Sequence, residues 1–377
     1  MTMMSKSRLL GLALVALACT LAVPAIAQAQ PKSVGKPVAS LTVGFVAAID
    51  QVALPVAVEQ GFFEKYGLDV KLAPAFASGV EALNSMQAGN LQFVQVGTPV
   101  LGAMLSGMDV AYVGGFMGSA VRVRMDETQA VIARQGSGID PNNYSTFKGK
   151  KIGSTLGSTN HIYIRNLLTS KGLKPEDYTL VNTSPPDMAV AMKTGGVDAI
   201  ACWDPWPVIT MNTNPGSFQI SRGGGYVANV GYIVAMREYA EKNPDVVERF
   251  LAARAEADLW VRKNPAAAVD VATRWVPGTS AEVARAAIGY TQKGMDGRLS
   301  GCTVLGMDEA MQFTLEMRKL TTKFDVTKYV RPQASMNVVK KYPALFADLP
   351  PIPADAVLPG DDMTKWNRAA AAKVCPL

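Results

Sequence analysis

The chain has 377 residues, of which 49% are hydrophobic and 18% charged, and its formal net charge is +6 at pH 7. Lysine and arginine form no dense block, so the sequence argues against a nucleic-acid-binding surface. The apolar content can fill one large core or two lobes, and after residue 29 no run of about 18 apolar residues could span a membrane.

Residues 1–29 have the layout of a secretory signal peptide. Two basic residues precede an uncharged apolar run, residues 9–23, and residues 25–29 offer A-x-A cleavage sites. A lipoprotein with Cys19 as the lipidated residue is the alternative, but the apolar run continues past this cysteine. We therefore expect export to the periplasm, removal of residues 1–29 and a soluble mature chain.

From residue 41 onward, short apolar runs typical of strands alternate with segments that have helical spacing. This order predicts a parallel sheet with helices on both faces. In the first half, strands are expected at 41–46, 69–74, 91–97 and 109–115, with helices at 51–68, 79–90 and 98–107.

The same alternation restarts at residue 129 and gives way to helices after residue 244. Strands are expected at 129–134, 150–155, 177–182, 197–203 and 231–236, with helices at 158–173 and 184–196. Further helices are expected at 244–264, 265–275, 280–292 and 307–324, before a proline-rich tail.

Two βαβ halves, joined by extended crossings near residues 126–134 and 230–237, predict a two-lobed α/β protein. Each lobe is expected to hold a mainly parallel sheet flanked by helices, with the ligand in the cleft beyond the carboxyl ends of the strands. The expected division is residues 40–128 with 236–300 for a discontinuous lobe 1, 129–235 for lobe 2, and 301–377 for a C-terminal helix and tail that pack on lobe 1.

The motifs of the common enzyme classes are missing. His161 is the single histidine, and no G-x-S-x-G nucleophile elbow, Rossmann G-x-G-x-x-G or P-loop occurs. Neither H-E-x-x-H nor C-x-x-C is present as a metal-binding signature. We therefore expect no catalytic residue, metal or cofactor, and a place for His161 on a helix surface or at the edge of the cleft.

A turn rich in small polar residues lies between an expected strand and the helix that follows. In "TLGSTN" (155–160), the backbone amides of Gly157 to Thr159 and the hydroxyls of Ser158 and Thr159 can donate to a carboxylate, sulfonate or similar oxyanion. The alternative is an ordinary helix N-cap built by Ser158 or Asn160, and the two roles are compatible. No lysine stands where a P-loop needs one, which favours reversible capture of an anion over phosphoryl transfer.

The end of the expected strand 197–203 carries an aromatic and an acidic candidate. Trp203 offers a flat apolar wall. Asp204 either accepts a hydrogen bond from an ammonium or amide group of a ligand, or N-caps the following helix. Tyr226 and Asn229, in the glycine-rich stretch before residue 231, are further candidates for the same rim.

Loops after the strands of the first half form the other side of the predicted cleft. Each of their residues alone also fits packing or capping, but together they make one rim. The candidates are Phe45, Asp50, Gln51, Thr98, Phe116, Met117 and Ser119.

Three cysteines follow residue 29. Cys202 lies in an expected buried strand, where a lone cysteine usually packs inertly. An oxidising compartment allows one pair, and a Cys302–Cys375 disulfide would fasten the C-terminal tail to the body. Separation in sequence leaves this pairing open.

Long segments of the chain resemble one family in order and spacing. "LPVAVEQGFFEKYGLDVKL", "ALNSMQAGNLQFVQVGTPVLGAMLSG" and "DVAYVGG" precede "FKGKKIGSTLGSTNHIYIRNLLTSKGL", "DYTLVNTSPPDMAVAMKTGGVDAIACWDPW" and "NPDVVERFLAA". Across residues 41–260 they closely resemble the solute-binding proteins of the nitrate/sulfonate/taurine (NitT/TauT, SsuA-like) class of ABC importers. The resemblance implies a type II periplasmic-binding-protein fold, with two crossings, and delivery of a ligand to an inner-membrane permease and its ATPase.

The resemblance leaves the ligand open, because such proteins take alkanesulfonates, taurine, nitrate, pyrimidine precursors or aromatic acids. The bulky apolar rim favours a small organic anion, an alkyl or aryl sulfonate or a carboxylate, over nitrate, and Asp50 and Asp204 keep taurine in the set. We expect a monomeric, periplasmic substrate-binding component that closes its lobes on the ligand. The alternatives are a pyrimidine-precursor binding protein or synthase-like relative, and a ligand-sensing module for a receptor kinase.

Overall fold

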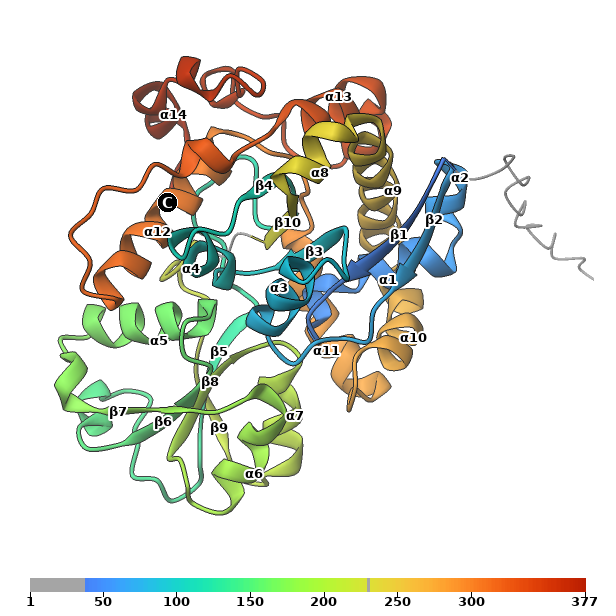
Figure 1. Ribbon diagram of the computed structural model, residues 1–377. Coiled ribbons are helices and arrows are strands. Elements are labelled where there is room, and N and C mark those ends of the chain that lie inside the picture. Colours follow the sequence, from blue (N-terminus) through green and yellow to red (C-terminus); the bar gives the residue numbers. More distant parts are fainter. Residues whose placement is uncertain (1–37, 229–230) are drawn as a thin grey trace, which may run out of the picture.

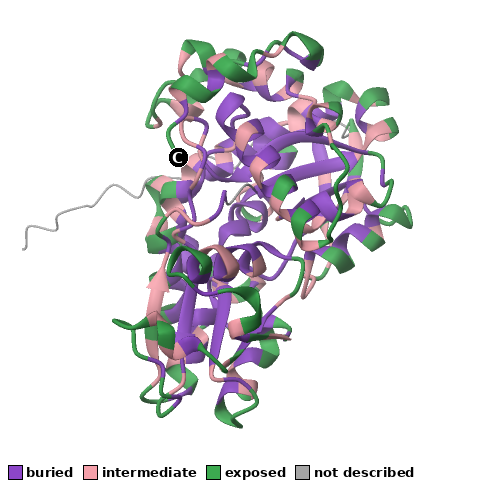
Figure 2. Cartoon of the chain, turned by 90° about the vertical axis from the view of Figure 1, so that its left-hand side faces the viewer, coloured by how far each residue is buried: buried purple, intermediate pink, exposed green. Residues whose placement is uncertain are grey.

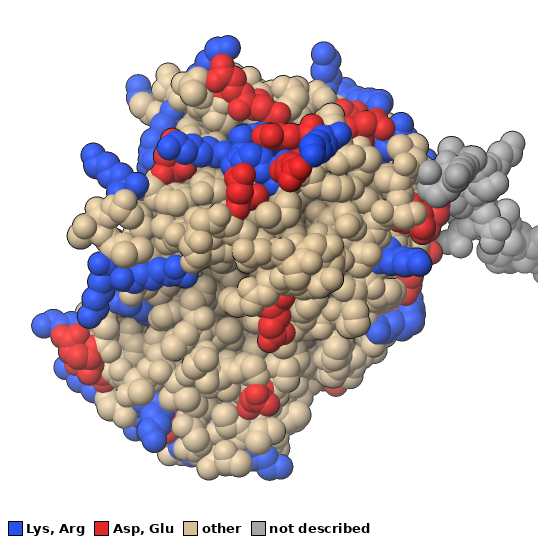
Figure 3. Space-filling model, viewed as in Figure 1, with Lys and Arg blue, Asp and Glu red and all other residues tan. Residues whose placement is uncertain are grey.

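The computed structural model describes residues 38–228 and 231–377, which form two α/β lobes (Figure 1). The expected signal peptide, residues 1–29, and the candidate Asn229 lie outside the described residues. None of the described helices is long and apolar enough to cross a membrane. On the face shown in Figure 3, basic and acidic side chains are interspersed with broad uncharged areas.

Lobe 1 contains a five-stranded sheet built, in spatial order, from β2 (Leu68–Leu72), β1 (Ala39–Gly44), β3 (Phe93–Val96), β10 (Gly231–Met236) and β4 (Val110–Met117). β1 runs parallel to β2 and β3, whereas β10 returns from lobe 2 and lies antiparallel between β3 and β4. Successive residues of β10 enter opposite hydrophobic clusters, Tyr232 and Val234 on one face and Ile233 on the other. Both faces of this sheet are therefore buried.

Lobe 2 contains the second five-stranded sheet, in the order β7 (Thr179–Asn182), β6 (Lys151–Ser154), β8 (Ala199–Trp203), β5 (Gln129–Ala133) and β9 (Phe218–Arg222). β6 is parallel to β7 and β8, and β5 is antiparallel to β8 and β9. Both sheets are thus mixed, because the crossing strands β5 and β10 enter against the direction of their neighbours. The edge strand β9 was not expected, since its polar residues leave no continuous apolar run.

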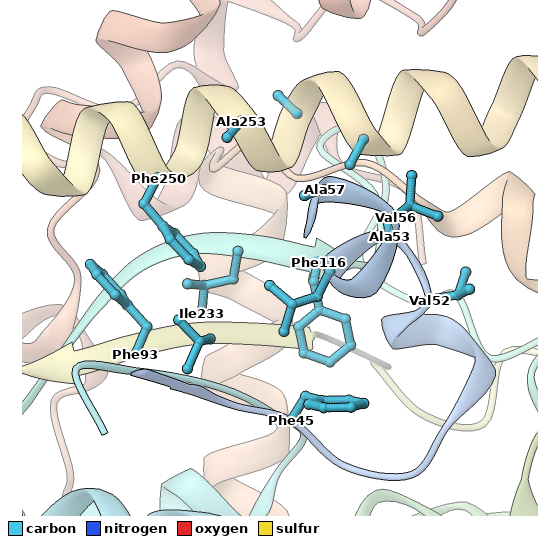
Figure 4. Packing of buried hydrophobic residues seen from close by; sticks show 14 of the residues in the cluster. Phe45, Val52, Ala53, Val56, Ala57, Phe93, Phe116, Ile233, Phe250 and Ala253 are labelled. Atoms are coloured by element: carbon cyan, nitrogen blue, oxygen red, sulfur yellow. The ribbon is translucent and has the colours of Figure 1, made fainter. Parts of the chain in front are cut away.

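Helices of lobe 1 cover the two faces of its sheet. One face carries α1 (Ala53–Glu59), α2 (Phe62–Lys65), α8 (Arg237–Lys242), α9 (Pro244–Lys263), α10 (Pro265–Trp275) and α11 (Ala281–Thr291), and the other α3 (Gly79–Gln87) and α4 (Pro99–Leu105). Figure 4 shows Phe250 of α9 stacked on Phe93 of β3, with ring centroids 4.3 Å apart. The single helix expected at 51–68 is divided, because Gly61 adopts a φ of 67° between α1 and α2.

Lobe 2 and the C-terminal region supply the remaining helices. Lobe 2 carries α5 (Thr159–Ser170), α6 (Met188–Lys193) and α7 (Trp206–Thr213), and the C-terminal region carries α12 (Gly301–Met317), α13 (Gln333–Lys341) and α14 (Arg368–Val374). Figure 2 shows that buried residues concentrate in the sheets and the helix faces that cover them.

The C-terminal region is built into the body of the protein. Met307 and Met311 of α12 belong to a hydrophobic cluster of lobe 1, whereas Phe313 packs against the cluster of lobe 2. A disulfide joins Cys302 at the start of α12 to Cys375 after α14. This bond fastens the end of the chain to a helix that contacts both lobes.

Candidate functional site

A pocket of about 600 Å³, counted together with the space that opens to solvent, lies between the two lobes. Lobe 1 lines it with the loop after β1, the N-terminal ends of α3 and α4, and the end of β4. Lobe 2 lines it with the start of β5, the turn between β6 and α5, and the end of β8. The cavity therefore lies beyond the carboxyl ends of β1, β3, β6 and β8, the expected place for a ligand in α/β sheets.

Residues predicted from the sequence reach this cavity from both lobes. Trp203 and Phe116 give it aromatic walls, and Asp50 is the single charged side chain among the described residues that line it. The described lining holds no lysine or arginine, so an anion would be bound by uncharged donors. The six predicted residues that line the cavity are Asp50, Gln51, Phe116, Ser158, Thr159 and Trp203.

Several polar residues of the lining were not predicted from the sequence. Gln129 is the first residue of β5, where the chain enters lobe 2, and Thr155 lies in the turn before α5. Ser78 is the N-cap of α3, and its hydroxyl accepts a hydrogen bond from the Glu81 amide at 3.4 Å. Two features of the sequence could have identified these residues. Gln129 is a polar residue at the point where the chain crosses into lobe 2, and Ser78 stands at a helix-capping position.

Phe45 and Met117 were wrongly placed at the rim, because both side chains point into the core of lobe 1 and are 1% exposed. Phe116 packs in the same hydrophobic cluster and also reaches the cavity wall, whereas Met117 lies against Gly294, where an added Cβ would meet its Sδ at 2.8 Å. The register of β4 against β10 is irregular here, with a shift between Gly231 and Tyr232.

Thr98 and Asn160 are buried and do not belong to the cavity lining, so the structure gives no support to their prediction as direct ligand contacts. The Thr98 hydroxyl is 3.3 Å from the Thr159 hydroxyl and buried. Asn160 is fully buried, and its Nδ2 donates to Ser154 Oγ at 3.1 Å and to the Ala201 carbonyl. Its side chain therefore holds α5 on the sheet.

Three further predicted residues lie away from the cavity lining. The Gly157 amide donates to Nδ1 of His161 at 3.1 Å, and burial followed by the charge of Arg165 lowers the pKa of this histidine to about 4. The Ser119 hydroxyl accepts from the Val121 amide at 3.2 Å. Tyr226 packs edge-on against Tyr163, with ring centroids 5.9 Å apart.

Asp204 is neutralised within the protein and not free for a ligand. Its two carboxyl oxygens accept from Nη1 and Nη2 of Arg222 at 2.6 and 3.1 Å. The N-cap of α7 is Pro205, so Asp204 does not cap this helix either. The predicted N-cap role was therefore wrong, and the predicted ligand role has no support in the lining, because the carboxylate pairs with a guanidinium 18 residues further along the chain.

The N-terminal end of α5 has backbone amides that could donate to an anion. Ser158 is the N-cap residue, but its hydroxyl donates to the Thr155 carbonyl at 2.6 Å and makes no capping hydrogen bond to the helix. The amides of the first turn thus keep their donor capacity and the positive end of the helix dipole. Since Ser158 and Thr159 both line the cavity, these donors lie at its wall.

Asp50 is the single charged side chain in the described part of this wall. It is 9% exposed, and its Oδ1 has no hydrogen-bond partner among the described residues. Burial, reinforced by the charge of Asp204 and opposed by that of Arg254, raises the pKa of Asp50 to about 7. Gln129 Oε1 and Trp203 Nε1, on the same lining, also lack partners among the described residues.

Comparison with known proteins identifies the family of this chain. Residues 35–276 match the NMT1-like family. The chain belongs to the NMT1-like family. Over 225 residues it is 27% identical to a Bacillus subtilis protein provisionally named an aliphatic sulfonates-binding protein, covering 58% of this chain and 64% of that relative.

A second relative and a solved structure are also similar to this chain. The chain is 26% identical over 257 residues to the nitrate/nitrite binding protein NrtA of Synechococcus elongatus, covering 59% of this chain and 55% of that one. The matched segments thus span less than two thirds of the length of these curated relatives. The alkanesulfonate-binding protein SsuA from Xanthomonas axonopodis pv. citri, solved with MOPS bound, superposes with a TM-score of 0.68 at 22% identity, over 79% of this chain and 99% of that chain.

These comparisons confirm the two-lobed periplasmic-binding-protein fold and the resemblance to the sulfonate and nitrate class. The relatives named here are binding proteins.

In this NMT1-like chain the lobes touch directly across the cleft: the Trp206 indole donates to the Ala47 carbonyl and the Ile49 amide to the Asp204 carbonyl, each at 3.2 Å. The structure is therefore that of a closed cleft.

The buried carboxyls of Asp50 and Asp204 should make the ligand-free protein less stable as the pH rises. Burial raises their pKa values from 3.8 to about 7 and about 6. Between about pH 4 and 7 the folded chain then binds more protons than the unfolded chain, so the free energy of unfolding due to these groups falls with rising pH. Urea unfolding should show that Asp50→Asn is more stable than the native protein at pH 8 but not at pH 5. An equal effect at both pH values would contradict the raised pKa of Asp50.

Proposed function

We propose that this NMT1-like protein is the periplasmic substrate-binding component of an ABC importer, which captures a small organic anion and delivers it to a membrane permease. The observation that carries the proposal is the N-terminal end of α5, whose first turn lacks a side-chain cap and lies at the wall of an apolar interlobe cavity. Backbone donors at a helix N-terminus bind anions without a charged side chain. Capture of this kind is reversible.

The rest of the lining indicates the body of the anion. Trp203, Phe116 and Val46 present apolar surface that nitrate could not cover, whereas an alkyl or aryl sulfonate or a carboxylate could. Relatives named for sulfonates and for nitrate support an anion as the ligand class. A synthase-like role is less well supported, because His161 uses Nδ1 to accept the Gly157 amide and does not belong to the lining.

We propose hinge closure as the mechanism. The ligand would bridge donors of lobe 2 and side chains of lobe 1, and its higher affinity for the closed form would shift the population toward closure. Importer delivery and sensing by a receptor kinase share this step, and co-purification with a permease or a kinase separates them. We expect the mature protein to be a monomer.

The close approach of the lobes at Gly97 gives a test of closure. A Cβ added to Gly97 would lie 2.9 Å from Thr159 Oγ1 in the other lobe. Gly97→Ala should therefore strain the closed form alone and weaken ligand binding by about fivefold or more. Gly289→Ala, where an added Cβ meets nothing within 4 Å, is the matched control. Titration calorimetry that finds the two variants equal would refute closure at this contact.

A thermal-shift screen of the mature protein tests the ligand class. The panel is taurine, alkyl and aryl sulfonates, aromatic carboxylates, nitrate and pyrimidines. A ligand present at about 100 times its Kd stabilises the native state by about 2.7 kcal/mol, which should raise the Tm by about 5 to 10 °C. A shift with sulfonates or carboxylates supports the proposal, whereas a shift with pyrimidines or nitrate alone contradicts it.

A further inference from the structure

A second hollow, the α3–α4 groove, adjoins the interlobe cavity on the surface of lobe 1. α3 lines it with the residues at positions i, i+3, i+4 and i+7 counted from Val80, and α4 with its C-cap residue lines it at the same spacing counted from Pro99. Residues at this spacing share one face of a helix, so the groove runs along the facing sides of the two helices. Val80 and Pro99 also line the cavity, and the two hollows therefore meet at these residues.

The cavity opens to solvent at the same place. Val80 of lobe 1 and Leu156 of lobe 2 both line the cavity, yet they are 53% and 43% exposed. An apolar ligand body that leaves the cavity here covers both side chains, which is favourable. The groove, about 590 Å³ counted together with the space that opens to solvent, then has room for the far end of such a ligand.

Arg318, the C-cap residue of α12, brings a cation to this groove. It is the single charged residue in the described lining, and it takes part in none of the ion pairs that the described residues form. Its guanidinium lies over Gly102 of α4, where an added Cβ would meet Nη2 at 2.5 Å. Gly102 follows Pro99 by three residues, a rise of about 4.5 Å along the helix. The cation therefore stands about one helical turn outside the cavity.

We propose that the α3–α4 groove is an outer subsite, in which Arg318 binds a second anionic group at the far end of an elongated ligand. This inference rests on the proposed function and narrows it from organic anions to those with an anionic group at each end. The first group lies at the start of α5, and the apolar body passes between Val80 and Leu156. The second group pairs with the guanidinium of Arg318.

The two anion sites differ in character. The inner site offers backbone donors and no described lysine or arginine, whereas the outer site offers an exposed guanidinium. A pair with an exposed cation is weak and is screened by salt. Arg318 lies outside residues 35–276, which match the NMT1-like family, so the outer subsite is a feature of the C-terminal region.

Titration calorimetry on the full mature chain tests the proposal at low ionic strength. Alkane-α,ω-disulfonates are compared with alkane-1-sulfonates of the same chain length, across a series of lengths. For at least one length the disulfonate should bind about threefold to fivefold more tightly than the monosulfonate. Arg318→Gln should remove this preference and leave the affinity for monosulfonates unchanged.

Arg285→Gln is the matched control, because it removes the same charge from an exposed position on α11 outside both linings. It should keep the preference for the disulfonate. In the native protein, high salt should reduce the preference to nearly none, since it screens an exposed pair.

Three results would overturn the inference while leaving the proposed function intact. They are equal affinities of disulfonate and monosulfonate at every length, a preference that survives Arg318→Gln, and an equal loss of the preference in Arg285→Gln. If no sulfonate or carboxylate binds at all, the proposed function itself is contradicted.

Discussion

Trp203→Ala should weaken ligand binding about 30-fold to 1,000-fold while lowering the free energy of unfolding by only about 1 kcal/mol. Aromatic residues in desolvated pockets contribute about 2–4 kcal/mol to binding when truncated. Trp203 ends β8 at the cavity, is half-buried, and has an indole N–H without a partner among the described residues. Its ring therefore faces the ligand more than the core.

The measurement is calorimetric titration with the best ligand of the screen, together with urea unfolding of the ligand-free protein. Trp366→Ala is the matched control, because Trp366 is also half-buried with an unpartnered indole N–H but packs on lobe 1 in the C-terminal region. This control should lose stability and keep affinity. If Trp203→Ala loses stability as strongly as affinity, Trp203 is a packing residue and its place in the site is wrong.

Removing the disulfide should have the largest effect on stability. Cys302 and Cys375 are separated by 73 residues, and in the chain-entropy account a loop of this size is worth about 4 kcal/mol. Both residues are at most 5% exposed, so the bond lies within packed structure. Cys302→Ser with Cys375→Ser should therefore lower the midpoint of urea unfolding strongly.

The double variant is compared with the native protein with and without a reductant. Reductant should lower the native midpoint to that of the variant and leave the variant unchanged. Ligand affinity should remain nearly the same in the folded variant, since neither cysteine belongs to the cavity lining. An unchanged midpoint in the variant would show that α12 and the tail hold their places without the bond.

The alternation of strand and helix predicted most of the fold because each element buries a recognisable apolar face. The exceptions have local causes. Gly61 divides one expected helix by its positive φ, and β9 at a sheet edge carries too few apolar residues to be noticed. The direction of the crossing strands β5 and β10 depends on how the chain passes between the two lobes, and local sequence patterns do not indicate this.

The site was predictable where a residue stands at a strand end and its role is local. Ser158, Thr159 and Trp203 meet this condition and reach the cavity. The pairing of Asp204 was not predicted because its partner, Arg222, comes from another strand, and the burial of Met117 was not predicted because it follows from how β4 packs in the core of lobe 1. Such pairings depend on tertiary structure, which a single sequence shows only indirectly.

The most direct test of the central claim is the crystal structure of the protein with the organic anion that the thermal-shift screen identifies. The proposed function predicts the sulfonate or carboxylate group at the start of α5, within hydrogen-bond distance of the backbone amides of Thr159 and Asn160, with Trp203 against its body. An anionic group bound elsewhere, or a cleft that stays open around the ligand, would contradict this account.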